Sequence, residues 1–100
     1  MADFGLRDYI EAEGKLVLVT PSFDFDSFDT IASSLVAQLS ATVVEKQWDA
    51  DIHTWLVDFE GCRMLLKGEH YSELMWFEAL DITGSKEEFD FLASIFRRGF

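Results

Sequence analysis

A β-hairpin predicted in the middle of the chain constrains the fold more than any other feature. Two apolar segments, residues 53–59 and 62–68, flank Glu60 and Gly61. Glycine supplies the positive φ that a two-residue hairpin turn needs, so the two segments are expected to pair as antiparallel strands.

The register set by this turn sorts the side chains of the hairpin by face. Three apolar pairs share one face: Phe59 with Cys62, Val57 with Met64, and Trp55 with Leu66. On the other face Asp58 lies opposite Arg63, an opposite-charge pair that contributes about 0.2–1 kcal/mol. The turn, the core face and the charge pair therefore agree on one register.

Four further segments are candidate strands: residues 6–10, 15–20, 42–48 and 74–82. The first alternates weakly and is a candidate edge strand. The second is rich in β-branched residues and ends at Pro21, which cannot donate to a ladder. A helix is the alternative for residues 74–82, because Glu, Leu, Met and Ala are helix formers. A strand is favoured there, because the apolar residues form a nearly continuous run rather than a stripe.

The first predicted helix covers residues 27–40. Its apolar side chains recur at i, i+3 and i+4 spacing: Phe28, Ile31, Ala32, Leu35, Val36 and Leu39. Asp24 and Asp26 offer N-cap oxygens, and Asp29 suits the positive end of the helix dipole. This acidic run lacks the third oxygen ligand, the glycine and the bidentate glutamate of an EF-hand loop, so it is interpreted as helix-end chemistry.

A second helix is predicted after Ser85, which forms a capping box with Glu88. Its apolar stripe is Phe89, Leu92, Ala93 and Phe96. Arg97 and Arg98 complement the negative end of this helix, and Gly99 fits a left-handed stop.

These elements predict an α+β fold. The expected architecture is an antiparallel sheet of four to five strands with two helices packed on one face, in the order β(β)αβββα. With 100 residues, 49% of them hydrophobic, and no repeat or linker, the chain is expected to form a single domain spanning residues 1–100.

Acidic residues outnumber basic ones by 19 to 8, which gives a formal net charge of −11. Nucleic acid and anionic membrane surfaces repel such a chain, whereas a basic protein partner, self-association or a bound cation remains open. The lone cysteine, Cys62, excludes an intrachain disulfide and is interpreted as a buried, inert thiol. The N-terminus has no signal-peptide pattern, so a cytoplasmic location is expected.

One end of the predicted hairpin gathers the residues most suited to chemistry. Five residues there are candidate metal ligands: Asp49, Asp51, His53, Glu69 and His70. Imidazole and carboxylate groups together suit Zn²⁺, Mn²⁺ or Fe²⁺, or acid–base catalysis. Because no recognised ligand spacing is present, the favoured interpretation is a solvated acidic turn without a cofactor, with a divalent metal as the alternative.

Trp48 and Tyr71 are candidate partner-binding residues. Trp48 has the polar neighbours Lys46, Gln47 and Asp49, and an exposed tryptophan beside acidic residues suits a protein-binding hot spot. The favoured alternative places Trp48 at the end of the core, which it would close.

Residues 45–61 and 68–72 resemble a small bacterial protein family of unknown function. Its members are similar to this chain in length, so the resemblance covers nearly all of it. The resemblance implies a stand-alone bacterial cytoplasmic protein, and it implies no catalytic residue and no cofactor.

Two functional hypotheses follow from the sequence. The favoured one is an interaction or regulatory domain without catalysis, as a homodimer or with another protein. The competing one is a metal-dependent or acid–base enzyme centred on Asp51, His53, Glu69 and His70.

Overall fold

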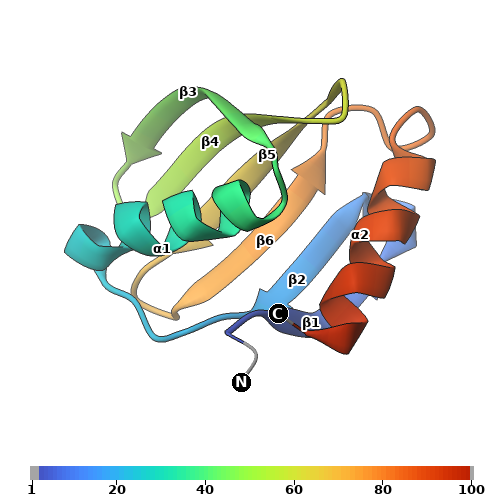
Figure 1. Ribbon diagram of the computed structural model, residues 1–100. Helices are drawn as coiled ribbons and strands as arrows, with labels where there is room; N and C mark the ends of the chain where they lie inside the picture. Colours follow the sequence, from blue (N-terminus) through green and yellow to red (C-terminus); the bar gives the residue numbers. More distant parts are fainter. Residues whose placement is uncertain (1–2, 100) are drawn as a thin grey trace.

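The computed structural model describes residues 3–99, which form one antiparallel sheet and two long helices (Figure 1). The strands are β1 (Gly5–Ile10), β2 (Lys15–Val19), β3 (Thr42–Asp49), β4 (Ile52–Phe59), β5 (Cys62–Glu69) and β6 (Leu74–Ala79). The helices are α1 (Phe25–Gln38) and α2 (Lys86–Arg98), and a short 3-10 turn, η1 (Glu11–Glu13), joins β1 to β2. Among residues 3–99, no helix has the length and apolar character that crossing a membrane requires.

The sheet has six strands in the order β1-β2-β6-β5-β4-β3, so the predicted count of four to five and the predicted element order are wrong. Both uncertain segments are strands. β1 pairs with β2 at one edge, and β6 lies between β2 and β5, where it joins the N-terminal hairpin to the rest of the sheet. In β6 the buried Met75 and Phe77 alternate with the partly exposed Leu74 and Trp76, which is the period of a strand and not of a helix.

The predicted hairpin register is confirmed. Phe59 pairs with Cys62, and each pair along β4 and β5 follows in the expected order. Glu60 and Gly61 both adopt positive φ, as a two-residue hairpin turn with the twist of the strands requires. Arg63 Nε lies 3.9 Å from Asp58 Oδ2 on the face away from the core.

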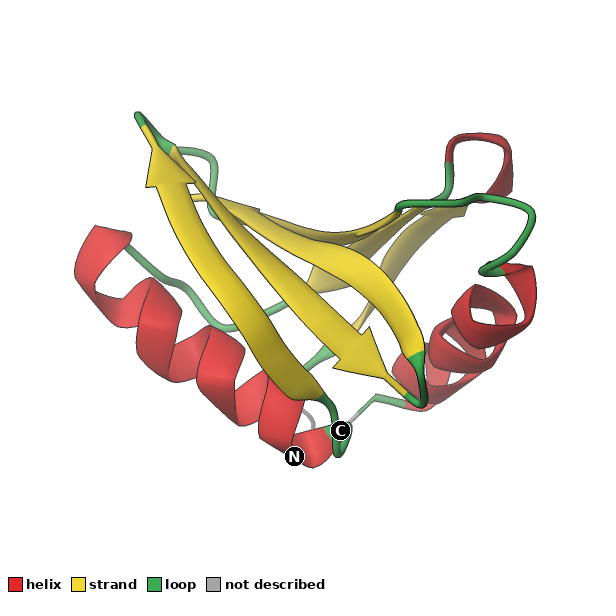
Figure 2. Cartoon of the chain, turned by 90° about the horizontal axis from the view of Figure 1, so that it is seen from above, coloured by secondary structure: helices red, strands yellow, loops and turns green. Residues whose placement is uncertain are grey.

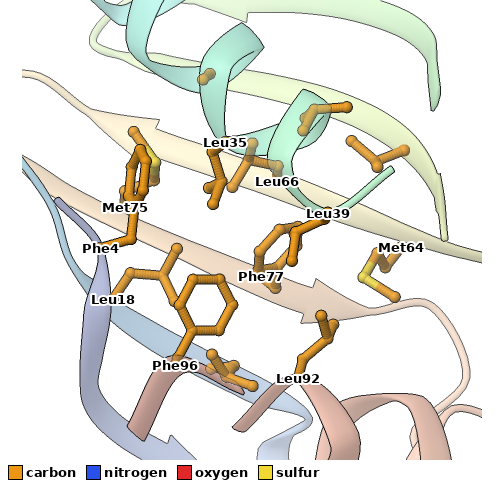
Figure 3. Close-up of a cluster of buried hydrophobic side chains, with 14 of the residues drawn as sticks. Phe4, Leu18, Leu35, Leu39, Met64, Leu66, Met75, Phe77, Leu92 and Phe96 are labelled. Carbon is orange, nitrogen blue, oxygen red and sulfur yellow. The ribbon is translucent and has the colours of Figure 1, made fainter. Parts of the chain in front are cut away.

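Both helices lie on the same side of the curved sheet (Figure 2). The chain runs from β2 through α1 to β3, the strand at the far edge, and α2 returns to pack beside β1 and β2. The apolar stripes of both helices meet the inner face of the sheet in one core (Figure 3), which includes Leu35, Leu66, Phe77, Leu92 and Phe96. Within residues 3–99, neither α1 nor α2 covers the other face of the sheet.

The first helix cap is confirmed at Asp24. The Ser27 amide donates to the Asp24 carboxylate at 2.8 Å, and the Asp24 amide donates to the Ser27 hydroxyl at 2.9 Å. Since Asp24 is the N-cap, α1 begins at Phe25, two residues before the predicted start.

The predicted capping box at Ser85 is wrong, because the Ser85 side chain makes no cap hydrogen bond. Ser85 has φ −101° and ψ 4° instead of the extended backbone of an N-cap, and its buried hydroxyl accepts a hydrogen bond from the Cys62 thiol at 3.5 Å. Cys62 itself is only partly buried, whereas a buried thiol was predicted. At the other end of α2, Gly99 has the expected positive φ, but its ψ of 151° lies outside the left-handed helical region.

Candidate functional site

Strand alternation divides the five candidate metal ligands between the two faces of the sheet. Asp49, Ile52 and Glu69 are direct cross-strand neighbours, so their side chains point to the same face. His53 follows Ile52 and points to the opposite, helix-covered face, where it is 8% exposed. Asp51 lies in the turn between β3 and β4. The structure thus brings His53 close to His70 but places Asp49 and Glu69 on the other side of the sheet.

Glu69 organises the turn that follows β5. Its carboxylate accepts hydrogen bonds from the Ser72 hydroxyl, from the Ser72 amide at 2.7 Å and from the Tyr71 amide at 3.2 Å. The Ser72 hydroxyl and amide hold the pKa of Glu69 below its usual range, so the carboxylate is ionised and fully engaged in the turn.

His53 and His70 lie with their ring centroids 6.2 Å apart, His53 buried under the first turn of α1. The His53 ring stacks on Phe28 at 4.3 Å, and Phe25 packs against both imidazoles. Burial lowers the pKa of His53, and the nearby His70 lowers it further, so His53 is neutral at neutral pH.

Two buried imidazole nitrogens, His53 Nε2 and His70 Nδ1, have no hydrogen-bond partner in the part of the chain that the structure describes. Within residues 3–99, no group of three or more His, Cys, Asp or Glu side chains is placed to hold a metal ion. The two histidines alone make a short donor set for a divalent cation, which commonly takes four or more ligands in proteins.

A groove of about 280 Å³ lies between the start of α1 and the outer strands β3 and β4. We call it the Trp48 groove; it is lined by Phe25, Asp26, Asp29, Lys46, Gln47, Trp48, His53 and Trp55. The buried His53 and Trp55 form its floor, and the more exposed Phe25 and Trp48 form two of its walls.

The favoured prediction, that Trp48 closes the end of the core, is wrong, because Trp48 is 67% exposed. Its position on β3 explains the exposure, since β3 is the edge strand of the sheet and all but one of its residues are exposed. The Phe25 ring meets Trp48 edge-on, with centroids 6.3 Å apart and an interplanar angle of 83°. The Asp24 cap places Phe25 there by fixing the first residue of the helix.

Lys46 occupies one side of the groove. Its ammonium lies 2.9 Å from the Asp29 carboxylate and 4.3 Å from the centre of the Trp55 ring. Lys46 and Trp55 are direct cross-strand partners, so their side chains share the face on which the helix lies.

Tyr71, the second partner-binding candidate, is 76% exposed but does not line the groove. Its ring packs against His70 with the ring centroids 4.5 Å apart.

Phe25 and Lys46 are groove residues that the sequence analysis did not single out. Phe25 stands three residues before Phe28 and extends the apolar stripe one turn beyond the predicted helix start. Lys46 stands two residues before Trp48 and therefore shares its face of the strand. Both signals were present in the sequence.

A family model described as "Protein of unknown function (DUF3630)" matches residues 4–97. The chain belongs to this family. The match covers every residue of the Trp48 groove, and it confirms the resemblance to a family of unknown function.

Isoleucine–tRNA ligases from Streptococcus pyogenes serotypes M3 and M28 are each 37% identical to this DUF3630 member over 51 residues. That stretch is 51% of the chain but only 6% of each ligase, so the similarity is confined to a short part of a much longer enzyme. No solved structure matches the chain.

Proposed function

We propose that this DUF3630 protein is a single-domain interaction or regulatory protein of the bacterial cytoplasm, which binds another protein at the Trp48 groove and has no catalytic activity of its own. The exposure of Trp48, at 67%, is the observation that carries the proposal. Tryptophan is the residue type most enriched at binding hot spots, and here it stands beside a second partly exposed aromatic and a hollow.

The charge of the chain supports a basic protein as the partner. A net charge of −11 attracts a basic surface and speeds its association, and it repels nucleic acid and anionic membranes. The same charge opposes self-association, so another protein is favoured over a second copy.

A matched pair of variants tests this proposal by affinity capture from a bacterial cytoplasmic extract. We expect the wild-type chain and Phe91→Ala to retain the same protein, and Trp48→Ala to lose it. Phe91 is a suitable control because it is also a half-exposed aromatic but lies on α2, outside the groove. Equal retention by all three chains, or none by any, would contradict the proposal. Sedimentation of the purified chain distinguishes a homodimer from a monomer.

The alternative function, a metal-dependent or acid–base enzyme using Asp51, His53, Glu69 and His70, has one observation in its favour. That observation is the pair of buried imidazole nitrogens without a partner. Thermal melting with and without Zn²⁺ or Mn²⁺ tests it, because a cation that binds the folded state raises the melting temperature. A rise that His53→Gln abolishes would favour the enzyme over the interaction domain.

A further inference from the structure

The Trp48 groove already accommodates one organic cation, the side-chain ammonium of Lys46. That ammonium sits over the face of Trp55 and pairs with the carboxylate of Asp29. An aromatic face within about 6 Å and a carboxylate counter-ion are the two elements of a cation–π site. The chemistry of the groove is therefore suited to positive charge.

Next to Lys46, the groove has two further aromatic rings and a second carboxylate. Phe25 and Trp48 stand at 83° to each other and form two aromatic walls. Asp26 lines the same groove, and within residues 3–99 its carboxylate has no ion-pair partner. Tryptophan, here Trp48, is the best aromatic partner for a cation among the protein side chains.

The charge around Phe25, Trp48 and Asp26 favours the binding of a cation. Asp29 neutralises Lys46, so the groove lining keeps one carboxylate, that of Asp26, in excess. The pKa of His53 is lowered, and its neutral ring adds no positive charge to the floor. The positive end of the α1 dipole lies nearby, but the ionised Asp24 cap offsets it.

We propose that the Trp48 groove binds an arginine side chain of the partner protein, stacked on the exposed Trp48 ring beside Phe25 and paired with Asp26. This inference rests on the proposed function and names the group that the groove recognises. A planar guanidinium stacks on an aromatic ring while its N–H groups donate to a carboxylate, which a lysine ammonium does less well. A metal ion is not the occupant, because Ca²⁺ and Mg²⁺ need about six oxygen ligands and the groove is walled by aromatic rings.

The test titrates the full chain with three peptides that differ at one position. The peptide Gly-Gly-Arg-Gly-Gly is compared with the same peptide carrying citrulline, the neutral isostere of arginine, or lysine. Binding is followed by NMR at the indole N–H of Trp48, which is distinct from those of Trp55 and Trp76. The titration is repeated in about 1 M salt, where the screening length is about 3 Å and long-range attraction is suppressed.

We expect a saturable shift at Trp48 with the arginine peptide and at least about fivefold weaker binding of the citrulline peptide. Asp26→Asn should weaken arginine binding about twofold, because it removes an exposed charge pair. Trp48→Ala, whose titration is followed at the indole N–H of Trp55 in the same groove, should weaken arginine binding at least about fivefold, and Phe91→Ala should leave it unchanged. The lysine peptide should bind more weakly than the arginine peptide.

Two results would overturn the inference. One is equal binding of arginine and citrulline peptides, and the other is the absence of a saturable shift at Trp48. If a captured protein still depends on Trp48 while arginine and citrulline bind equally, the interaction domain stands and the arginine assignment fails. If no protein depends on Trp48 either, both fail.

Discussion

The two ends of α1 each adjoin a hollow in the surface, and the smaller of the two is the proposed binding site. The hollow at the C-terminal end, which we call the Phe91 hollow, has a volume of about 560 Å³, twice that of the Trp48 groove. It is lined by Gln38, Leu39, Ser40, Phe59, Glu60, Phe91 and Ile95. Its two aromatic rings, Phe59 and Phe91, stack face to face at 6.2 Å, whereas Phe25 and Trp48 stand edge-on.

Polar groups also differ between the two ends. The last carbonyl groups of α1 accept backbone hydrogen bonds, as Ala37 does from Ser40 and Val36 from Ala41. Each hollow has one carboxylate without an ion-pair partner among the described residues, Asp26 at the N-terminal end and Glu60 at the C-terminal end. Only the N-terminal end adds a buried imidazole nitrogen, His53 Nε2, without a hydrogen-bond partner among these residues. The exposed Trp48 and the unpartnered imidazole nitrogen, and not the volume, favour the N-terminal hollow as the proposed site.

The largest expected effect is on stability, at Phe28 beneath the N-terminal end. Phe28 is fully buried and stacks on His53, so Phe28→Ala should lower the free energy of unfolding by about 3–5 kcal/mol in a urea titration. The matched variant at the other end is Leu39→Ala, with an expected loss of about 2–5 kcal/mol. Under folding conditions only Phe28→Ala should weaken arginine binding. Equal weakening by both variants would contradict the assignment of the site to the N-terminal end of α1.

A smaller loss is expected for Gly68→Ala, which also acts on the N-terminal end. A Cβ at this position would lie 2.2 Å from Phe28 Cε2, closer than two carbon atoms can approach. The expected cost is about 1–3 kcal/mol, because Phe28 has to move. Gly5→Ala is the control, since its Cβ would meet only ordinary contacts at 3.6 Å and beyond. A Gly68→Ala chain as stable as Gly5→Ala would show that the Phe28–His53 stack is placed incorrectly.

The pH dependence of stability should also trace to the N-terminal end. Because burial depresses the pKa of folded His53, its contribution to stability is complete above the unfolded value of about 6.5. That contribution is lost as the pH falls below this value toward the depressed pKa, since only the unfolded chain gains the proton readily. Urea midpoints measured from about pH 7.5 to about pH 5.5 should decline more in the wild-type chain than in His53→Gln. Parallel declines would contradict the burial of a neutral imidazole.

The smallest stability effects are expected at the exposed aromatics. Trp48→Ala and Phe91→Ala should each change the free energy of unfolding by less than about 1 kcal/mol, because both side chains are at least half exposed. A larger loss in the free energy of unfolding for Trp48→Ala alone would indicate that Trp48 stabilises the fold.

Much of the fold could be predicted from local signals. The turn at Glu60 and Gly61, the core face and the charge pair determined the hairpin register, and the apolar spacing determined both helices. The strand count was wrong because the place of β6 between β2 and β5 depends on contacts between distant parts of the chain. The Ser85 cap failed for a similar reason, since a tertiary contact with Cys62 competes for its hydroxyl.

The candidate site was only partly predictable. The predicted register places His53 and His70 at the same end of the sheet. Because side chains alternate between the two faces along a strand, Asp49 and Glu69 lie on the opposite face from His53. The exposure of Trp48 depends on how α1 packs against the edge strand β3, which no local pattern determines. Phe25 and Lys46 each have a local signal, but their meeting in one groove depends on the same packing.

The most direct test of the account compares the affinity of the arginine peptide for three chains: wild type, Trp48→Ala and Phe91→Ala. The account predicts that Trp48→Ala loses at least about fivefold in affinity, whereas Phe91→Ala stays within about twofold of wild type. Equal affinities for all three chains, or a loss confined to Phe91→Ala, would contradict the assignment of the binding site to the N-terminal end of α1.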